Sequence, residues 1–477
     1  MSSIIVSNGT VVTPSSKGMK IIEDGAVAIE GSQIEGIGKT FEIESRFSPE
    51  IEIDATGKAI LPGFVDAHIH TPLSLFRGLA QDVPESEWMT KAIDPLANKM
   101  TKKAAITGSK LTVIEGLKAG TTCFCDYATS MADLVKNVYL GAGVRANVCS
   151  TINEVGTEKE GKGILYPFDR ARGEKRLKEN IELVKKWQGA GNGRITCLFG
   201  PQAADMLSRD FLLQVRDAAI EYDLPIHMHV AQGQRERGQM MERYGKSTVN
   251  FLNEIGYLDD RLIAVHCHDT TKKELALLTK NNVRMVGCPG SIGMIDGIVP
   301  PLANFKRLGG VTGIGSDQCP PDGHNMFMEA KYASILSKTK HKDPTALPAW
   351  DALRMLTIGG ARCHGLHRDI GSIEAGKKAD LILIDIERAN LVPIVKQPIR
   401  NIIPNLILHG KGSEVTTAII DGKIVLQNGN TTTMDESTIL KEAQKTASKL
   451  AEVAAEDFVK AGSELLTMKK IVSTSEE

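Results

Sequence analysis

Short apolar runs alternate with segments of helical period through the middle of the chain, and this alternation limits the folds open to it. The runs are RANVCST, RITCLFG, LPIHMHV, LIAVHCH, VRMVGCP and GVTGIGSD. Segments such as RLKENIELVKKWQ, RDFLLQVRDAAIEYD and KKELALLTKNN separate them. Strands joined by helical crossovers form parallel sheets, and over about 300 residues the usual closed form is a barrel. We therefore predict an α/β fold with a (β/α)8 TIM barrel over residues 61–370.

Both ends of the chain differ from this middle. Residues 3–54 and the later segments ADLILIDI and VTTAIIDGKIVLQNG are β-type runs separated by Asn-Gly, Asp-Gly or Gly-Ser pairs, which hairpin turns favour. The pattern predicts one small β-sandwich domain built from both termini, residues 1–60 plus 371–430. Two separate β caps are the alternative. Residues 431–477 have helical period and are predicted to form a C-terminal helical tail, on the surface or against another subunit.

Composition excludes several classes of protein. The 477 residues carry a formal charge of −1, which gives no electrostatic case for binding nucleic acid or an anionic membrane. The chain has no uncharged run of the roughly 18 apolar residues that a membrane helix needs. Eight scattered cysteines and no secretory signal favour a reducing cytoplasm. We expect a cytoplasmic protein that acts on a small molecule, as a homo-oligomer.

Histidine and aspartate side chains end four of the predicted strands. They are His68 and His70, His227 and His229, His266, and Asp317. Because chemistry in such barrels lies at the carboxyl ends of the strands, and residues two apart on a strand point the same way, these side chains are expected to converge. Neutral imidazole and carboxylate suit zinc or ferrous iron. The sequence therefore predicts a catalytic metal site. The thiols of Cys123 and Cys125 are the weaker alternative, since no second thiol pair lies near them.

Several stretches resemble the amidohydrolase superfamily, in particular its chlorohydrolase-like branch of triazine hydrolases and methylthioadenosine/S-adenosylhomocysteine deaminases. They are LPGFVDAHIHTPLSLFRGLAQDVPESEWM, EGLKAGTTCFCDY, GIGSD and GSIEAGKKADLILID, and the resemblance runs nearly from end to end. It implies a metal-dependent hydrolase of a non-peptide C–N bond in a small molecule. The expected reaction is hydrolytic deamination of an N-heterocycle or amidine.

The resemblance also implies roles for single residues. The metal ligands match His68, His70, His229 and Asp317, and the aspartate also takes a proton from the attacking water. His266 matches a histidine that contacts this water or the substrate, and Trp88 matches an aromatic residue of the substrate pocket. No strand ends on a lysine that could bridge two metals as a carbamate, so we expect one divalent ion per chain, zinc with iron as the alternative. His227 is expected to support the ligands from outside.

Two glutamines depart from the family pattern. HMHVAQGQ places Gln232 where deaminases of this branch carry a glutamate, and GPQAADM places Gln202 where many carry a histidine. An amide makes hydrogen bonds but cannot carry a proton at neutral pH. We therefore expect both glutamines to bind the substrate, with Gln232 standing at the position of the usual acid–base residue.

The missing glutamate leaves other readings open. Hydrolysis of a urea, carbamate or amide, as in phenylurea hydrolases, needs less proton transfer and is the alternative reaction. A non-catalytic scaffold is the third reading, although such relatives usually lose the metal ligands. Glu236 is a candidate substitute, but its charged QRERGQ surroundings predict a solvated position. His268 and Asp269 are expected to orient His266, to form part of a substituted proton relay, or to cap a turn.

Overall fold

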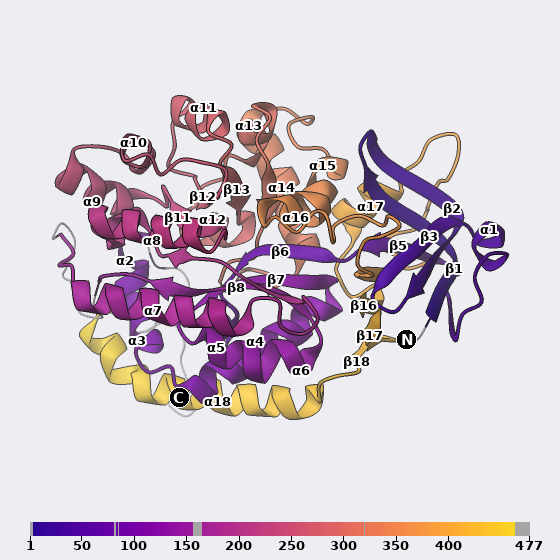
Figure 1. The fold of residues 1–477 in the computed structure, drawn as a ribbon, viewed down its shortest axis with the longest axis horizontal. Coiled ribbons are helices and arrows are strands. Elements are labelled where there is room, and N and C mark those ends of the chain that lie inside the picture. The colour runs from indigo at the N-terminus through magenta and orange to yellow at the C-terminus, as the bar shows by residue number, and fades with distance from the viewer. Residues whose placement is uncertain (1–2, 81–82, 84, 156–164, 319, 463–477) are drawn as a thin grey trace, which may run out of the picture.

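Parallel strands of the central region close into a barrel (Figure 1). The computed structural model describes residues 3–80, 83, 85–155, 165–318 and 320–462. One half of the barrel contains β6 (Phe64–Ile69), β7 (Thr121–Ala128), β8 (Arg145–Ile152), β9 (Ile195–Cys197) and β10 (Gly200–Pro201). The other half contains β11 (Ile226–Val230), β12 (Leu262–His266), β13 (Arg284–Gly287) and β14 (Thr312–Ile314). Parallel bridges between Phe199 and Ile226, and between Ile69 and Asp317, join the halves into a ring. The predicted barrel is confirmed.

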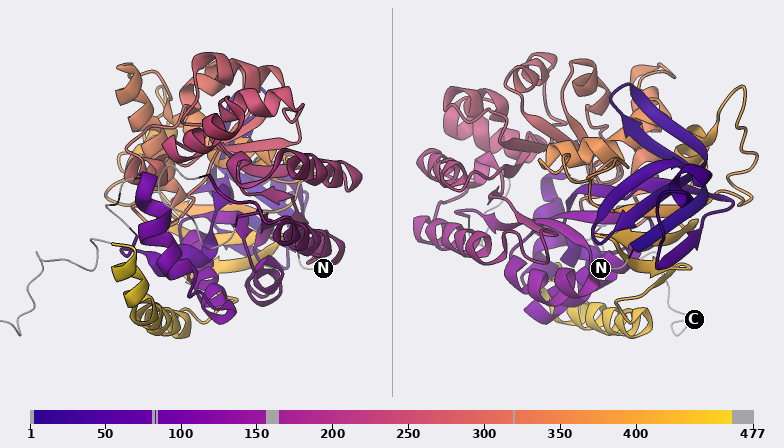
Figure 2. Two further views of the ribbon diagram at one scale, coloured as in Figure 1. Left: turned by 90° about the vertical axis from the view of Figure 1, so that its left-hand side faces the viewer. Right: turned by 45° about the vertical axis from the view of Figure 1, so that its right-hand side comes forward.

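Helices follow the barrel strands and surround them (Figure 2, left). They include α4 (Lys102–Lys118), α7 (Arg170–Trp187), α8 (Arg209–Glu221), α9 (Gln234–Tyr244), α10 (Thr248–Glu254), α11 (Lys272–Lys280), α12 (Pro289–Ile295), α13 (Leu302–Arg307), α14 (Met326–His341) and α15 (Ala349–Arg354). Side chains that cap free backbone N–H groups set several of their starts: Thr101 caps α4, Asp169 caps α7, and Thr271 caps α11 in a capping box with Glu274.

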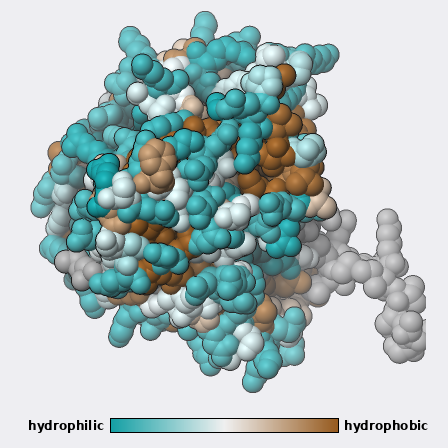
Figure 3. Space-filling model, turned by 90° about the vertical axis from the view of Figure 1, so that its right-hand side faces the viewer, coloured by the Kyte–Doolittle hydropathy of each residue, from teal (hydrophilic) through white to brown (hydrophobic). Residues whose placement is uncertain are grey.

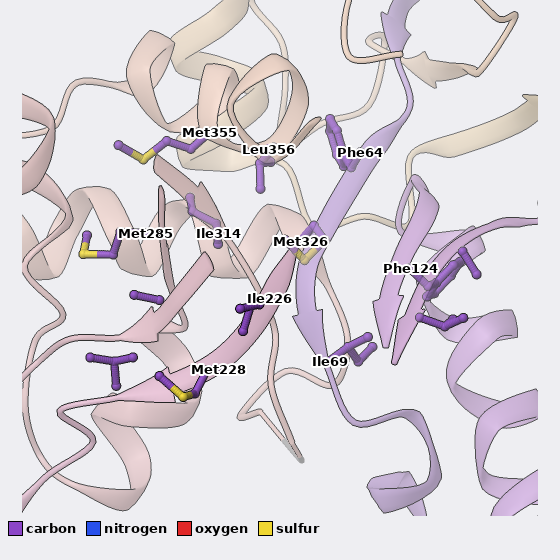
Figure 4. Packing of buried hydrophobic residues seen from close by; sticks show 14 of the residues in the cluster. Phe64, Ile69, Phe124, Ile226, Met228, Met285, Ile314, Met326, Met355 and Leu356 are labelled. Carbon is purple, nitrogen blue, oxygen red and sulfur yellow. The ribbon is translucent and has the colours of Figure 1, made fainter. Parts of the chain in front are cut away.

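The largest apolar core lies between the barrel strands and these helices. Figure 4 shows Phe64 and Ile69 on β6, Ile226 and Met228 on β11, and Met285 packed within this layer. All five side chains are buried. Helices cover the outer face of the strands, and side chains fill the inside of the barrel, so both faces of each strand are buried. The strands therefore consist of nearly continuous apolar residues, as the short apolar runs of the sequence predicted.

One β domain unites the two ends of the chain. Its strands are β1 (Ser3–Ser15), β2 (Gly18–Glu30), β3 (Gln33–Lys39), β4 (Ile51–Asp54), β5 (Lys58–Pro62), β15 (Leu381–Asp385), β16 (Val415–Ile420), β17 (Lys423–Gln427) and β18 (Asn430–Thr431). They form a single sheet in the order β18-β17-β16-β15-β5-β1-β2-β3, with β4 paired to β1. The antiparallel β5–β15 pair joins the N-terminal strands to the C-terminal ones. The alternative of two separate β caps is therefore wrong. Seen from this end, hydrophilic residues cover most of the surface and hydrophobic residues appear in separate areas (Figure 3).

The C-terminal tail forms a long helix, α18 (Glu436–Lys460), that lies along α4 (Figure 1). It buries Ala443, Leu450, Ala454 and Phe458 in an apolar cluster with residues from the start of the barrel region. The tail is helical over Glu436–Lys460, and residues 463–477 of the predicted tail lie outside the described range. Among the described residues, no helix has the length and apolar character needed to cross a bilayer.

A buried ion pair ties the barrel to the β domain. The Arg145 guanidinium, at the start of β8, lies 2.7 and 2.9 Å from the two carboxylate oxygens of Asp380, just before β15. Both side chains are almost fully buried, and Asp421 lies 3.8 Å from the guanidinium. This contact therefore links the start of the barrel strands to the β domain.

We predict that Asp380→Asn lowers the free energy of unfolding by about 3 kcal/mol, because it leaves the Arg145 charge buried without its main partner. Urea denaturation of the purified protein measures the change. Asp385→Asn is the matched control, since Asp385 pairs with the half-exposed Arg388 at 2.8 Å and its loss should cost less than about 1 kcal/mol. Equal effects of the two variants would contradict the prediction.

Candidate active site

Side chains from four strand ends meet at one point of the barrel. His68 and His70 come from the end of β6, His229 from β11, His266 from the end of β12, and Asp317 from the segment after β14. Nε2 of His68 and Nε2 of His70 each lie 3.4 Å from Oδ1 of Asp317. The ligand atoms of His68, His70 and His229 lie within 4.8 Å of one another, as do those of His68, His266 and Asp317. The predicted convergence is therefore present.

Hydrogen bonds from outside orient three of these imidazole rings. Nδ1 of His70 lies 2.7 Å from the carbonyl oxygen of Tyr127, and Nδ1 of His229 lies 2.7 Å from that of Gln202. A carbonyl oxygen only accepts, so each Nδ1 carries the proton and each Nε2 keeps a free lone pair for a cation. Nδ1 of His68 lies 3.0 Å from Nε2 of His227. His227 thus supports His68 from behind, as its position in the sequence suggested.

The electrostatics of the cluster suit a cation. Burial lowers the pKa of His68 and His266 well below the ordinary range and lowers that of His229 to about 4, with neighbouring histidines adding to the effect. The rings are therefore neutral at pH 7, the form that binds metal. Among the described residues, His68 Nε2 and Asp317 Oδ1 are buried and have no hydrogen-bond partner. Such atoms are costly unless something pairs with them, so the residues fit a divalent ion.

The two cysteines of the alternative metal site lie elsewhere. Cys123 and Cys125 are buried in an apolar cluster with Val65, Ala361 and Ile370. Neither belongs to a metal-binding group among the residues that the structure describes.

The backbone takes a left-handed conformation at three non-glycine residues of the site. Ala231, His266 and Asp317 have φ angles of 52°, 76° and 60°. This conformation costs energy for residues with a side chain and concentrates at functional sites. Two backbone hydrogen bonds hold Asp317 in it: its N–H donates to the carbonyl oxygen of His68 at 2.8 Å, and its own carbonyl accepts from His70 N–H at 3.0 Å.

A cavity of about 620 Å³ opens beside the cluster, within the usual range for small-molecule sites. Its lining includes His70, His229, Gln202, Gln232, Gln318 and Arg172. The Arg172 guanidinium donates to Asn153, whose side-chain amide in turn donates to Gln202, so the Gln202 side chain is oriented from behind. Both glutamines thus reach the cavity, where the sequence placed them.

Trp88 lies deeper than expected. Its indole N–H donates to the carbonyl oxygen of Ala80 at 2.9 Å, and its ring belongs to an apolar cluster. It borders a small chamber next to the cavity, while Met89 lines the cavity itself.

The expectation of a solvated Glu236 is wrong. This side chain is 1% exposed, and its carboxylate accepts hydrogen bonds from the N–H groups of Ala231 and Gln232 and from the Thr248 hydroxyl. Burial and the neighbouring Asp205 raise its pKa to about 7, against these hydrogen bonds. Its role is to hold the loop after β11. The buried Arg235–Asp205 ion pair beside it was not foreseen, because charged runs in a sequence usually lie on the surface.

Comparison with known proteins agrees with this geometry. Over 446 residues the chain is 32% identical to a 5-methylthioadenosine/S-adenosylhomocysteine deaminase of Moorella thermoacetica, covering 93% of this chain and 99% of the relative. The structure matches an adenosine deaminase from Xanthomonas campestris with bound zinc (TM-score 0.86, 29% identity, 94% and 98% of the two chains). It also matches the fold of the zinc-complexed atrazine chlorohydrolase of Arthrobacter aurescens TC1 (TM-score 0.81, 19% identity, 93% and 100%).

The model of the Amidohydrolase family matches residues 59–425, which include all the residues of the cluster. The relatives named above include two deaminases, and with the family match they identify this chain as a hydrolase of C–N bonds other than peptide bonds. On the sequence, the barrel and the convergent site alike, this chain belongs to the amidohydrolase family.

Proposed function

We propose that this protein is a metal-dependent deaminase of a purine-type heterocycle, in which His68, His70, His229 and Asp317 hold one zinc ion. The observation that carries the proposal is the cluster of imidazoles and one carboxylate beside a 620 Å³ cavity. When bound, such an ion lowers the pKa of a water molecule to about 7 and so supplies hydroxide. The named deaminases that resemble this chain support the heterocyclic substrate.

The chain's own residues have distinct tasks in this reaction. Asp317, whose second oxygen Oδ2 accepts from the Ser291 hydroxyl at 3.0 Å, takes the proton of the attacking water. His266 stacks on His229 at a centroid distance of 5.3 Å. Burial lowers the pKa of His266, so the ring is neutral, and neither of its nitrogens has a hydrogen-bond partner among the described residues. Its N–H is therefore available to stabilise charge that develops on the substrate. Gln202 and Gln232 offer amide hydrogen bonds to the heterocycle from the cavity wall.

The amide at position 232 also supports a second candidate, hydrolysis of a urea, carbamate or amide. There the attacked carbonyl oxygen takes up the charge, and no ring nitrogen must be protonated by the protein.

A cellular compartment and an oligomeric state follow from the same reasoning. We place it in the cytoplasm, because every cysteine that the structure describes is buried and free. We place it in a closed homo-oligomer, for which the exposed Leu440, Val453 and Val459 of α18 offer apolar surface.

Ammonia release by the purified enzyme tests the reaction. We predict turnover of at least one among adenosine, 5-methylthioadenosine, S-adenosylhomocysteine and guanine when the protein carries zinc, iron, cobalt or manganese. Phenylureas, carbamates and simple amides should be hydrolysed at least 100-fold more slowly. Preference for the second group would replace the deaminase with the carbonyl hydrolase, and activity on neither would reject both.

Metal content tests the ligands. We predict that Ala at His68, His70, His229 or Asp317 removes the metal and the activity but leaves the far-ultraviolet circular dichroism unchanged, because the barrel is filled by its own side chains. His227→Ala is the matched control from the same strand. It should keep a metal ion with about 10–100-fold weaker affinity, because it only orients His68. Full metal content in His229→Ala, with loss in His227→Ala, would show that the two roles are reversed.

A further inference from the structure

A second carboxyl group borders the candidate site. Asp296, directly after α12, lines a small chamber together with Gln232, Asp317, Gln318 and Trp88. The chamber measures about 20 Å³, enough for one water molecule or one amino group. Gln232 and Gln318 line both this chamber and the large cavity, so the chamber is a side pocket of the substrate site.

A buried histidine lies beside this carboxyl group. Nε2 of His268 lies 3.5 Å from Oδ2 of Asp296, and both side chains are at most 4% exposed. Burial lowers the pKa of His268 to about 4, an effect to which Lys340 adds and which Asp317 and the main chain of Gln232 oppose. The ring is therefore neutral, with one donor and one acceptor nitrogen. A neutral imidazole can hydrogen-bond Asp296 both when it is ionised and when it is protonated.

The leaving group needs a proton, and Asp317, which takes the proton of the attacking water, is the one carboxyl group among the four proposed metal ligands. Amine departure needs a proton on nitrogen, and acid–base catalysis of this kind contributes typically 10²–10⁴-fold. Gln232 cannot provide the proton. Glu236 is occupied by two backbone N–H groups and the Thr248 hydroxyl. Asp296 is the carboxyl group that shares the chamber with Asp317 among the residues that the structure describes.

We propose that the leaving amino group of the substrate occupies this chamber and that Asp296, positioned by His268, protonates it there. The inference rests on the proposed deaminase function. It makes Asp296 a catalytic residue and His268 a positioning residue, and it assigns to Asp296 the task that a carboxyl group at position 232 would otherwise perform.

Both carboxyl groups take part in the proton transfers. As the water oxygen bonds to the ring carbon, the π electron pair of the ring C=N bond moves onto the ring nitrogen, and one water proton passes to Asp317. The pair on the ring nitrogen then restores the C=N bond as the bond to the amino group breaks with its electron pair, and Asp296 gives its proton to that nitrogen, which leaves as ammonia. The ring keeps the hydroxyl group. The proton on Asp317 then crosses the chamber to Asp296, and both carboxyl groups return to their starting states.

The test compares two leaving groups in the zinc-loaded enzyme. Adenosine, or whichever heterocyclic amine the wild type deaminates fastest, is assayed beside its 6-fluoro analogue, because fluoride has nearly the size of an amino group and leaves without a proton. We predict that Asp296→Asn lowers kcat on the amine 10²–10⁴-fold with little change in KM, and lowers turnover of the fluoro analogue less than tenfold. Zinc content should not change. Asp351→Asn is the control, since Asp351 is similarly buried, pairs with Lys306 at 2.8 Å and lies outside the site.

Three further variants separate catalysis from folding. Gln232→Glu alone should lower turnover of the amine, because it adds a carboxylate beside Asp317 and Asp296. In the Asp296→Asn background the same change should raise it at least tenfold, since it returns a carboxyl group to the chamber wall. His268→Gln should lower kcat about tenfold and shift the acid limb of the pH–rate profile, which a purely structural role would not do.

Equal losses on the amine and the fluoro analogue, or less than a tenfold loss on the amine, would overturn the role of Asp296. A wild-type enzyme that releases ammonia from no heterocycle would instead overturn the proposed function, so the two failures are distinct.

Discussion

The pairing of β6 with the segment after β14 is the contact on which the site depends. The barrel closes there, through the bridge between Ile69 and Asp317. Main-chain hydrogen bonds from Asp317 to His68 and from His70 to Asp317 cross the same seam. The first and last strands of the barrel thus bring residues almost 250 positions apart in the sequence within 3.4 Å. The contacts that close the barrel therefore also bring His68 and His70 to Asp317, and they stabilise the left-handed backbone at Asp317.

Much of this arrangement could be predicted from the sequence, because it depends on periodicity and on strand ends. The alternation of apolar runs with helical segments corresponds to the observed barrel. Histidines two apart on a strand face the same way, and the polar residues of β6, β11 and β12 and of the segment after β14 meet at one end of it. His227 and His229 lie on the same strand but at different depths. The deeper His227 ring orients His68, and the His229 ring lines the cavity.

The sequence could not predict the positions of side chains that depend on contacts between distant segments of the chain. Glu236 stands in a charged run that is typical of a surface, yet α9 turns it inward to satisfy the N–H groups of the loop after β11. Trp88 was expected in the wall of the substrate pocket. It packs instead in an apolar cluster and borders only the small chamber. Asp296 lies in a loop with no motif, and its closeness to His268 depends on how α12 packs beside the end of β12. No local pattern reports such a contact.

The same contacts explain why an amide suits position 232 in this chain. The N–H of Gln232 donates to Glu236, whose pKa burial and Asp205 raise to about 7, and Arg235 already offsets the charge of Asp205. A carboxylate at position 232 would be a further negative charge between this group and Asp317, in a region with little water to screen it. Asp296 lines the chamber together with Asp317, and the neutral imidazole of His268 lies 3.5 Å from its carboxylate. In a barrel the ends of separate strands border one cavity, so a proton carrier can be supplied from another strand end without any change in the metal ligands. The amide at position 232 avoids a further charge beside Glu236, and in the proposed reaction Asp296 carries the proton instead.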